Sequence, residues 1–427
     1  MNPIDRRSFL LSFPAIARSA ASDRVRVALI GAGGRGKDLL RNASAVPGVE
    51  VATICDPDET RMRQMAEQAT TRTGKSPALQ ADLRRVIEDR DIDAVILTCC
   101  NHWHALATIW AVQAGKHVYV EKPVSHDVDE GTRMVAAARR YKRVVQGGTQ
   151  RRSSERFRKA IAYLHSGGIG DIYMARWLFT GPRDSIGFRS PEEPPADLHW
   201  DLWLGPAPKQ PFHRNLVHYN WHWFWDFGSG EMGNNGVHYL DVIRWALKKG
   251  APRRIYSNGG RFGYRDQAQT PNTQLAQMQY EDGVEILCEI RGLYSNEETG
   301  MHFYGSKGVM HLDRSGNFQV YAGRSKKPEL VVDEGWGGNA EEVGHFRNFI
   351  DAVRANDKGM LNCDIEEAEC STLLCHLANI SYRLKREVRF DAASRRFVGD
   401  SEADALLGRT GQPPFSLPEI RGEGTKS

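Results

Sequence analysis

The sequence predicts two domains in series: a doubly wound parallel α/β sheet, then an α+β domain with a mostly antiparallel sheet. Three observations favour this fold class. Short apolar strands alternate with helices over residues 24–147, a glycine-rich turn joins the first strand to the first helix, and β-rich runs follow one another over residues 254–321. Alternation with helices is typical of parallel sheets, and direct succession is typical of antiparallel ones. The 427 residues suffice for two buried cores.

The alternation in the first half is regular. Strands are predicted at 24–30, 49–55, 94–98, 117–120 and 144–147, and helices at 37–43, 60–71, 83–89, 104–114 and 128–141. The last of these strands is followed by Gly148, so the first domain is expected to end there and to cover residues 23–148.

The second half has a different pattern. Helices are predicted at 153–166, 236–248, 340–355 and 365–385, and a strand at 171–180. Residues 181–225 are rich in Pro, Trp and His and show little periodicity, whereas turn signals separate the β-rich runs between 254 and 321. The second domain is therefore predicted to cover residues 149–410, and the tail 411–427, with its Pro and Gly, is expected to extend over the surface.

Composition limits the classes of partner. Hydrophobic residues make up 41% and charged residues 26% of the chain, as in ordinary soluble globular proteins. The 57 basic and 53 acidic residues leave a net charge of +4, too balanced to indicate binding to nucleic acid or to an anionic membrane surface. The seven cysteines have no metal-ligand spacing and are expected to be buried free thiols. No metal site and no membrane insertion of the mature chain are predicted.

The N-terminus resembles a twin-arginine export signal. Residues 5–10 read Asp-Arg-Arg-Ser-Phe-Leu, an apolar stretch covers 9–17, and small residues at 19–22 offer a cleavage region. We expect residues 1–22 to be this signal and the protein to be periplasmic or otherwise exported. The alternative is a disordered basic leader on a cytoplasmic protein. Free thiols agree with folding in the cytosol before export.

The glycine-rich turn predicts a dinucleotide site. Gly31, Gly33 and Gly36 fit the spacing G-x-G-x-x-G between a strand and a helix. The first glycine permits the tight turn, the second lets the backbone approach a pyrophosphate, and the third lets the helix pack closely on the strand. The other members of the loop, Gly34 and Arg35, are assigned to the same cofactor site.

Asp56 ends the next strand, twenty residues after the last glycine of the turn. A carboxylate there accepts hydrogen bonds from the adenosine ribose and repels a 2′-phosphate, which predicts NAD rather than NADP. Asn101 and His104 follow the strand 94–98, at the sheet edge where ligands bind, and are assigned to the cofactor; the alternative for His104 is to cap the next helix.

Taken together, these motifs resemble the Gfo/Idh/MocA (glucose–fructose oxidoreductase / inositol dehydrogenase) family over residues 25 to about 389. The motifs that carry the resemblance are G-A-G-G-R-G at 31–36, Asp56, C-N-H-W-H at 100–104, A-G-K-H-V-Y-V-E-K-P at 114–123 and G-N-N-G-V-H-Y-L-D at 233–241. The resemblance implies a Rossmann domain with bound NAD and a second α/β domain. The open, mostly antiparallel sheet of that second domain carries the substrate pocket and often forms a homo-oligomer, here a dimer or tetramer.

The resemblance also implies catalytic roles. Lys122 matches the lysine beside the nicotinamide and the substrate hydroxyl, Pro123 sets the turn that presents it, and Glu121 places it and contacts the cofactor. His238 matches the histidine on the substrate side. Relatives usually carry an aspartate four residues before that histidine, whereas this chain has Asn234, and an amide cannot transfer a proton.

Substrate contacts are expected from the second half of the chain. Besides His238, the candidates are Arg151, Tyr219, Trp221 and Asn234, and Arg151 is equally well read as a surface charge. Trp221 and Trp225 are expected to form one wall if the segment is helical, because residues i and i+4 share a helix face.

Three functions remain open from the sequence. The first is an NAD-dependent oxidoreductase acting on a sugar or cyclitol hydroxyl, with NAD tightly held. The second is an NAD-dependent glycoside hydrolase that oxidises the ring transiently, eliminates the leaving group and restores NAD⁺. The third is a noncatalytic, NAD-bound sugar-binding protein. Export favours a cycle that regenerates NAD⁺ internally, because free NAD is scarce outside the cytoplasm.

Overall fold

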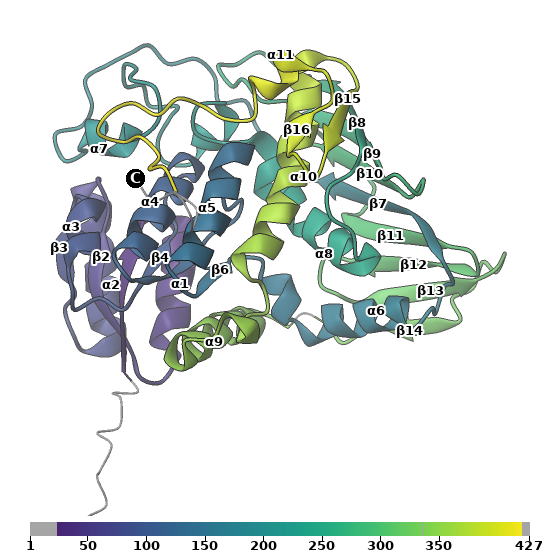
Figure 1. Ribbon diagram of the computed structural model, residues 1–427, viewed down its shortest axis with the longest axis horizontal. Helices are drawn as coiled ribbons and strands as arrows, with labels where there is room; N and C mark the ends of the chain where they lie inside the picture. Colours follow the sequence, from purple (N-terminus) through teal and green to yellow (C-terminus); the bar gives the residue numbers. More distant parts are fainter. Residues whose placement is uncertain (1–23, 336, 421–427) are drawn as a thin grey trace, which may run out of the picture.

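The computed structural model describes residues 24–335 and 337–420, so the predicted export signal lies outside the described residues. Its first half is a parallel sheet in the order β3-β2-β1-β4-β5-β6 (Figure 1). The strands are β1 (Val25–Ile30), β2 (Val49–Cys55), β3 (Ala78–Gln80), β4 (Ala94–Leu97), β5 (His117–Val120) and β6 (Val145–Gly147). This arrangement confirms the predicted Rossmann sheet; β3 is a short edge strand that the sequence analysis did not predict.

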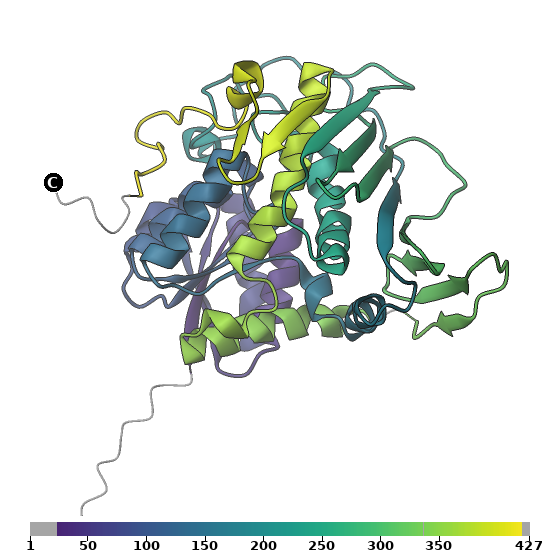
Figure 2. The ribbon, with the colours of Figure 1, turned by 45° about the vertical axis from the view of Figure 1, so that its right-hand side comes forward.

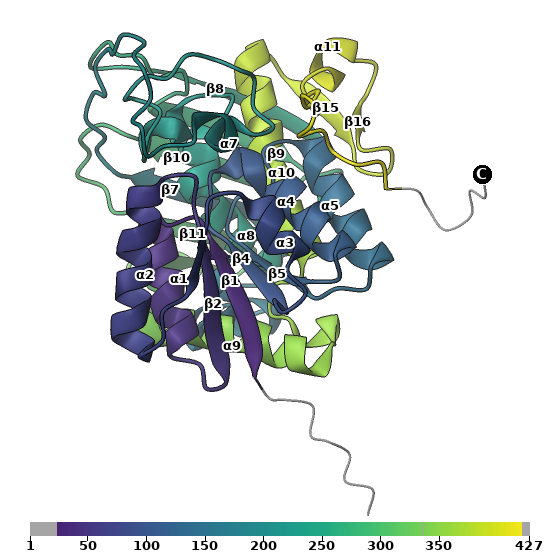
Figure 3. The same cartoon turned by 90° about the vertical axis from the view of Figure 1, so that its left-hand side faces the viewer.

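Helices cover both faces of this sheet, as Figure 3 shows from the side. They are α1 (Gly34–Ser44), α2 (Glu59–Thr73), α3 (Leu83–Glu88), α4 (Asn101–Gln113) and α5 (Val128–Arg140). Along β1, Val27 and Leu29 belong to the core under α1 and α2, whereas Ala28 and Ile30 belong to the core under α3, α4 and α5. A strand that is buried on both faces has to be apolar on both, which explains why residues 27–30 of β1 are all apolar, whereas Arg26 near its start is only partly buried.

Helix α9 (Asn339–Ala355) returns from the second half of the chain to the first. Its Phe346, Phe349 and Ile350 are fully buried in the core that also contains Leu39 of α1 and Tyr119 of β5. The sequence places this helix in the second domain, and its amphipathic pattern alone does not say which sheet it covers. The structure therefore completes the Rossmann layer with a helix from about 200 residues further along the chain.

The second half forms a ten-stranded sheet in the order β14-β13-β12-β11-β7-β10-β9-β8-β15-β16. Its strands are β7 (Ile172–Thr180), β8 (Arg254–Gly260), β9 (Thr273–Gln279), β10 (Glu285–Arg291), β11 (Gly300–Gly305), β12 (Gly308–Asp313), β13 (Phe318–Ala322), β14 (Leu330–Val332), β15 (Val388–Asp391) and β16 (Arg396–Phe397). All pairs are antiparallel except β7 with β10. The expected mostly antiparallel sheet is confirmed.

Helices cover one face of this second sheet and leave the other open (Figure 2). The covering helices are α6 (Glu155–His165), α8 (Val237–Leu247) and α10 (Ile365–Leu384), whose apolar residues share one core with the inward side chains of the strands. Tyr256 and Leu275 lie on the opposite face and are 44% and 46% exposed.

The Trp-rich residues 181–231 and the C-terminal tail cross from the second domain onto the first, as Figure 1 shows. Trp203, Phe212 and Phe227 build a small core of this segment, which includes the short helices α7 (Trp200–Leu204) and η2 (Asn220–Trp223). In the tail, the ring of Phe415 lies 5.3 Å from that of Trp103 on α4. The remaining short elements are η1 (Gln150–Ser153), η3 (Met232–Gly236), η4 (Lys358–Met360) and α11 (Ser401–Asp404). None of the helices in the described part of the chain is long and apolar enough to cross a membrane.

Candidate active site

The glycine loop has the shape that a dinucleotide pyrophosphate requires. Gly31 has φ +108°, a conformation that L side chains rarely adopt, and a Cβ on Gly36 would lie 2.2 Å from the Gly31 carbonyl oxygen. In contrast, a Cβ on Gly33 or Gly34 would meet no protein atom within 4 Å. These two glycines therefore leave open space at the N-terminus of α1, whose positive end favours phosphate groups. The loop fits the predicted cofactor.

Asp56 lies beside this loop at the end of β2. One carboxylate oxygen accepts a hydrogen bond from the Ala32 backbone N–H (2.6 Å) and the other from that of Asp58 (2.8 Å). Burial raises the pKa of Asp56 above its usual value, and these two N–H donors oppose the shift. Asp56 lines a cavity of about 90 Å³ together with Gly31 and Gly33, which is where the adenosine ribose of a dinucleotide would lie.

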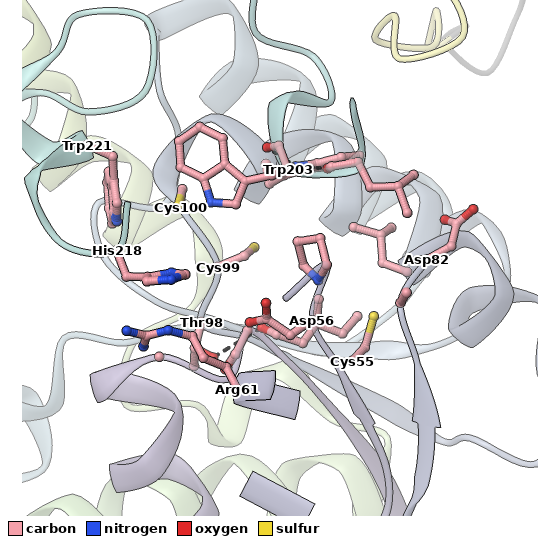
Figure 4. Close-up of a pocket in the computed structure, with 18 residues that line it drawn as sticks. Cys55, Asp56, Arg61, Asp82, Thr98, Cys99, Cys100, Trp203, His218 and Trp221 are labelled. Carbon is pink, nitrogen blue, oxygen red and sulfur yellow. Dashed lines mark hydrogen bonds between the residues drawn. The ribbon is translucent and has the colours of Figure 1, made fainter. Parts of the chain in front are cut away.

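The other wall of this cavity comes from the Trp-rich segment, which we call the cap (residues 181–231). Figure 4 shows Trp203, His218 and Trp221 across the cavity from Asp56 and Arg61. The cap is attached to the loop after β2: the Glu59 N–H donates to the Asp197 carbonyl and the His199 N–H donates to the Pro57 carbonyl, both at 2.9 Å.

Side chains add further links between the cap and the first domain. His218 Nε2 lies 3.1 Å from the Asp58 carboxylate, and the Trp103 indole N–H donates to the carbonyl oxygens of Leu202 and Trp203. The cap therefore contacts the first domain at the loop after β2 and at α4. It covers the cavity between them, which is the adenosine side of the cofactor site.

Trp221 has a different place from the one predicted. Its 3₁₀ turn puts the side chain into the cofactor cavity, with its ring stacked on His222 at 3.6 Å, whereas Trp225 lines a separate cavity. The expected common wall of Trp221 and Trp225 is therefore wrong, because residues four apart do not share a face when the helical turn ends at Trp223.

Glu121 and Arg35 bridge the glycine loop and the lysine motif. Arg35 Nε donates to Glu121 at 2.8 Å, and its Nη1 donates to Glu342 of α9 at 2.9 Å. Glu121 is only 4% exposed, and a Cβ on Gly148 would lie 2.7 Å from its carboxylate. The ion pair thus fixes the start of the E-K-P turn against the cofactor loop.

Lys122 follows at once and points into the second domain. Its peptide bond to Pro123 is cis, and its Nζ donates to the Asn234 backbone carbonyl at 2.9 Å. Asn234 lies in the π-helical turn η3, where the wider winding leaves carbonyl groups free of the regular α-helical ladder. Burial and the charges of Arg35 and Arg151 lower the pKa of Lys122, which increases its neutral fraction.

His238 on α8 faces the same point from the second domain. Burial lowers the pKa of this imidazole well below its usual value, and the charge of Lys122 is the next largest cause, followed by that of Arg151. Its Nδ1 has no hydrogen-bond partner among the described residues. The charge of Lys122 therefore acts on His238, although more than 100 residues separate the two along the chain.

The Asn234 amide makes no hydrogen bond among the described residues; a carboxylate on this side is that of Glu231, a polar residue which the sequence already offers as a candidate near the pocket. It is 2% exposed, accepts hydrogen bonds from Arg183 Nε (2.6 Å) and Asn235 Nδ2 (2.5 Å), and raises the pKa of Lys122 against the effect of burial. Glu231 lies three residues before the expected aspartate position and directly precedes the π-helical turn.

His104 is a correction to the predicted cofactor contacts. Helix α4 starts at Asn101, so His104 is inside the helix, 1% exposed, and its ring nitrogens contact the carbonyl oxygens of Pro123 (2.8 Å) and Cys99 (3.0 Å). A neutral imidazole donates to only one of these carbonyls; the ring does not line the cofactor cavity and does not cap the helix, and it holds the E-K-P turn. Asn101 is buried in the first turn and does not line the cofactor cavity.

Two of the predicted substrate contacts lie on different sides of the site. Arg151 lines a second cavity with His238, and its guanidinium stacks 4.4 Å from the ring of Tyr239. Tyr219 is 50% exposed and lies 5.8 Å from the Arg183 guanidinium at the cap. His222, stacked on Trp221, is close enough to Lys122 for the lysine charge to lower its pKa.

Among the described residues, three potential metal ligands come within 4.8 Å of one another at His126, Asp127 and Glu130. Arg409 donates two hydrogen bonds to Glu130, which places a cation where a metal would need free negative charge. This group therefore does not indicate a metal centre, and the cofactor loop remains the feature that organises the site.

Replacing Asp56 is expected to change the choice of cofactor. Asp56→Ala should weaken NAD binding about tenfold to a hundredfold, as expected for the loss of a hydrogen bond to a charged group. Asp56→Asn keeps one acceptor oxygen but removes the charge, and Arg61 lines the same cavity as a cation for a 2′-phosphate. Titration with NAD⁺ and NADP⁺ should therefore show a reduced preference for NAD in both variants; unchanged dissociation constants would contradict the role of Asp56.

Comparison with known families covers both domains. A family model described as an oxidoreductase family, NAD-binding Rossmann fold, matches residues 25–149, and a model described as the C-terminal alpha/beta domain of the same oxidoreductase family matches residues 185–417. The two models carry the common name GFO_IDH_MocA. Together they include the glycine loop, the E-K-P turn and α8.

Individual relatives match to different extents. Inositol 2-dehydrogenase of Salmonella typhimurium is 32% identical over 345 residues, which is 78% of this chain and 86% of the relative. Inositol 2-dehydrogenase 3 of Saccharopolyspora erythraea is 36% identical, but the match spans 37% of this chain and about half of the relative, 46%. A glycosyl hydrolase family 109 protein of Shewanella pealeana is 34% identical over 28% of this chain and 27% of its own length.

Among solved structures, levoglucosan dehydrogenase in complex with NADH and levoglucosan superposes with a TM-score of 0.66. The match covers 86% of this chain and 99% of that one at 18% identity, and it shows the shared two-domain fold.

Proposed function

Because this chain belongs to the Gfo/Idh/MocA oxidoreductase family, we propose that it oxidises a hydroxyl group of a sugar or cyclitol with NAD⁺. The observation that carries this proposal is that Lys122, which the Asn234 carbonyl holds and whose charge acts on His238, follows directly on the Glu121 that is paired with the open glycine loop through Arg35. The inositol 2-dehydrogenases among the relatives support the substrate class.

Bound NAD⁺ supplies the hydride acceptor. Neutral Lys122 takes the proton of the substrate hydroxyl, and the Asn234 carbonyl orients its Nζ and stabilises the ammonium group that results. His238 is neutral because of its lowered pKa, so it accepts or donates a hydrogen bond at the same oxygen without adding a second cation. Glu121 and Arg35 keep the E-K-P turn in place.

Tightly held NAD is the second part of the proposal, and the cap supports it. Backbone and side-chain contacts join the cap to the loop after β2 and to α4, so the dinucleotide leaves only when these contacts open. Retained NAD favours a cycle that returns to NAD⁺. An NAD-dependent glycoside hydrolase is therefore the second candidate, to which the similarity to a glycosyl hydrolase family 109 protein adds support.

Export and self-association complete the proposal. The twin-arginine motif at residues 5–10 supports export of the folded, NAD-loaded protein to the periplasm. The uncovered face of the second sheet, with Tyr256 and Leu275, supports a homo-oligomer, because exposed apolar groups on a sheet face are often buried between subunits.

Purified protein should first be tested for bound NAD(H) by its absorbance and then incubated with free sugars, cyclitols and aryl glycosides. Reduced nicotinamide that accumulates with a free sugar or cyclitol supports the oxidoreductase. Aryl alcohol released without net reduction supports the hydrolase. Bound NAD without either reaction would contradict both enzymatic functions and favour the noncatalytic sugar-binding protein.

A further inference from the structure

A cavity of about 140 Å³ lies on the substrate side of His238 and is unusually rich in arginine. Arg151, Arg156 and Arg314 line it, together with Gln150 and two glutamates at the start of α9. The volume is several times the ~30 Å³ that one water molecule occupies, so the cavity can take a small polar ligand.

The two glutamates of this cavity are already paired. Glu341 accepts a hydrogen bond from Arg156 Nη2 at 2.5 Å, and Glu342 accepts one from Arg35 Nη1 at 2.9 Å. Arg156 is therefore neutralised by a carboxylate from the protein. The remaining arginines of the cavity have no such partner.

Arg151 is a cation of this cavity that has no counter-ion among the described residues. Within residues 24–335 and 337–420, it forms no ion pair, and its Nη1 is buried without a hydrogen-bond partner. The rings of Tyr239 and Phe157 lie 4.4 Å and 5.4 Å from its guanidinium carbon, so they hold the group in place but leave its N–H donors free. A guanidinium stays charged, and a charged N–H group that is buried, as at Nη1, is costly unless an acceptor binds it.

Two further features of the cavity lining, Arg314 and the N-terminus of α9, add to the positive electrostatic potential around Arg151. Arg314 is exposed at the turn between β12 and β13 and forms no ion pair with a described residue. Gly338, which precedes the first turn of α9, lines the cavity as well, so the positive end of this 17-residue helix adds to the field.

The cavity also adjoins the reacting groups. His238 is part of its lining, and the charge of Arg151 contributes to the lowered pKa of both His238 and Lys122. A group bound by Arg151 in this cavity therefore lies beside His238. A guanidinium pairs with a carboxylate through two parallel hydrogen bonds.

We propose that the substrate is a sugar acid, a uronate or aldonate, whose carboxylate pairs with Arg151 while a ring or chain hydroxyl lies between Lys122 and His238. This inference rests on the proposed oxidation and narrows its substrate class. The reaction is the same: the substrate carbinol loses a hydride to NAD⁺ and a proton to Lys122, and the carboxylate is unchanged.

The test compares acids with matched neutral compounds. Glucuronate, galacturonate and gluconate are offered to the NAD-loaded protein beside glucose, galactose, myo-inositol and glucose 6-phosphate, and reduced nicotinamide is measured. Wild-type protein should prefer a sugar acid. Arg151→Met should raise the KM for that acid about tenfold to a hundredfold with a smaller change in kcat, because a charge-assisted pair is lost. Arg151→Lys should recover part of the loss.

A control variant separates the effect of Arg151 from that of removing any arginine, and a binding measurement separates binding of the acid from its oxidation. Arg158→Met removes an exposed arginine of α6 that does not line the cavity, and it should leave the KM for the acid unchanged. Binding of each compound is followed by tryptophan fluorescence, and thermal unfolding shows that the variants are folded.

Four results bear on the proposed sugar-acid substrate. Equal oxidation of neutral and acidic compounds would overturn the acid preference and leave the proposed function standing. Preference for glucose 6-phosphate would show that Arg151 binds a phosphate rather than a carboxylate, and it would overturn the inference that the substrate is a sugar acid. An acid that binds wild-type protein but not Arg151→Met, without being oxidised, would support the anion site and contradict the proposed oxidation. An acid that neither binds nor reacts would overturn the inference.

Discussion

Lys122→Met should abolish turnover while NAD remains bound. Methionine has a similar length but no proton acceptor, and general base catalysis contributes about a hundredfold to ten-thousandfold to the rate. Lys122 contacts the second domain through the Asn234 carbonyl rather than the glycine loop, so the pyrophosphate cradle is left unchanged. Single-turnover formation of reduced nicotinamide measures the loss of catalysis, and the dissociation constant for NAD measures whether cofactor binding is retained.

The pH dependence of the wild-type rate provides an independent check on the same residue. Only the neutral amine accepts the hydroxyl proton, so kcat/KM for oxidation should rise with pH and level off above the pKa of Lys122. Because burial lowers this pKa from 10.5, the plateau should be reached below the pH at which an ordinary lysine titrates. In the reverse direction, reduction of the carbonyl needs the ammonium form and should fall over the same interval.

Two further variants show whether the effect is specific. Lys122→Arg keeps a positive charge that does not titrate, and it should be inactive and without this pH dependence. Lys75→Met removes a lysine that is 68% exposed beside Glu50, far from the site in the chain, and should have wild-type kinetics. Turnover in Lys122→Met at more than a tenth of the wild-type rate would show that another group takes the proton.

Gly36→Ala should destabilise the first domain. The added Cβ would lie 2.2 Å from the carbonyl oxygen of Gly31, and backbone atoms cannot swing aside as the end of a flexible side chain does. To make room, α1 has to move away from β1, which loosens the core in which Leu39 of α1 is buried. Overpacking of this kind costs about 1–3 kcal/mol or more, which should appear as a lower unfolding temperature and a loss of soluble, NAD-loaded protein.

The other glycines of the same loop separate folding from cofactor binding. A Cβ at Gly34 meets no protein atom within 4 Å, and alanine is the better helix former, so Gly34→Ala should keep the wild-type stability. Gly33→Ala should also fold, because its φ of −79° is allowed for alanine, but it should weaken NAD binding by placing a methyl group where the pyrophosphate approaches. If Gly36→Ala had the same stability as Gly34→Ala, the close approach of α1 to the loop would be disproved.

The sequence predicted the elements whose signals are local. The alternation of strands and helices up to Gly147, the glycine loop and the E-K-P turn all follow from periodicity, backbone freedom and turn chemistry within a few residues. Asp56 and Glu121 were found for the same reason, since each directly adjoins such an element. The role of His104 was predicted wrongly, because no local signal marks the start of α4 at Asn101.

The sequence by itself determined the two-domain fold and the residues that line the two edges of the cofactor site. Only the tertiary structure decided that α9 belongs to the first sheet, that the cap closes over Asp56, and that the Asn234 carbonyl holds Lys122. It alone also showed that Arg151, beside His238, has no counter-ion within the described part of the chain. The physical reason is that these contacts join segments many residues apart, and a pattern of neighbours along the chain carries no record of which distant surfaces meet or which charges remain unpaired when they do.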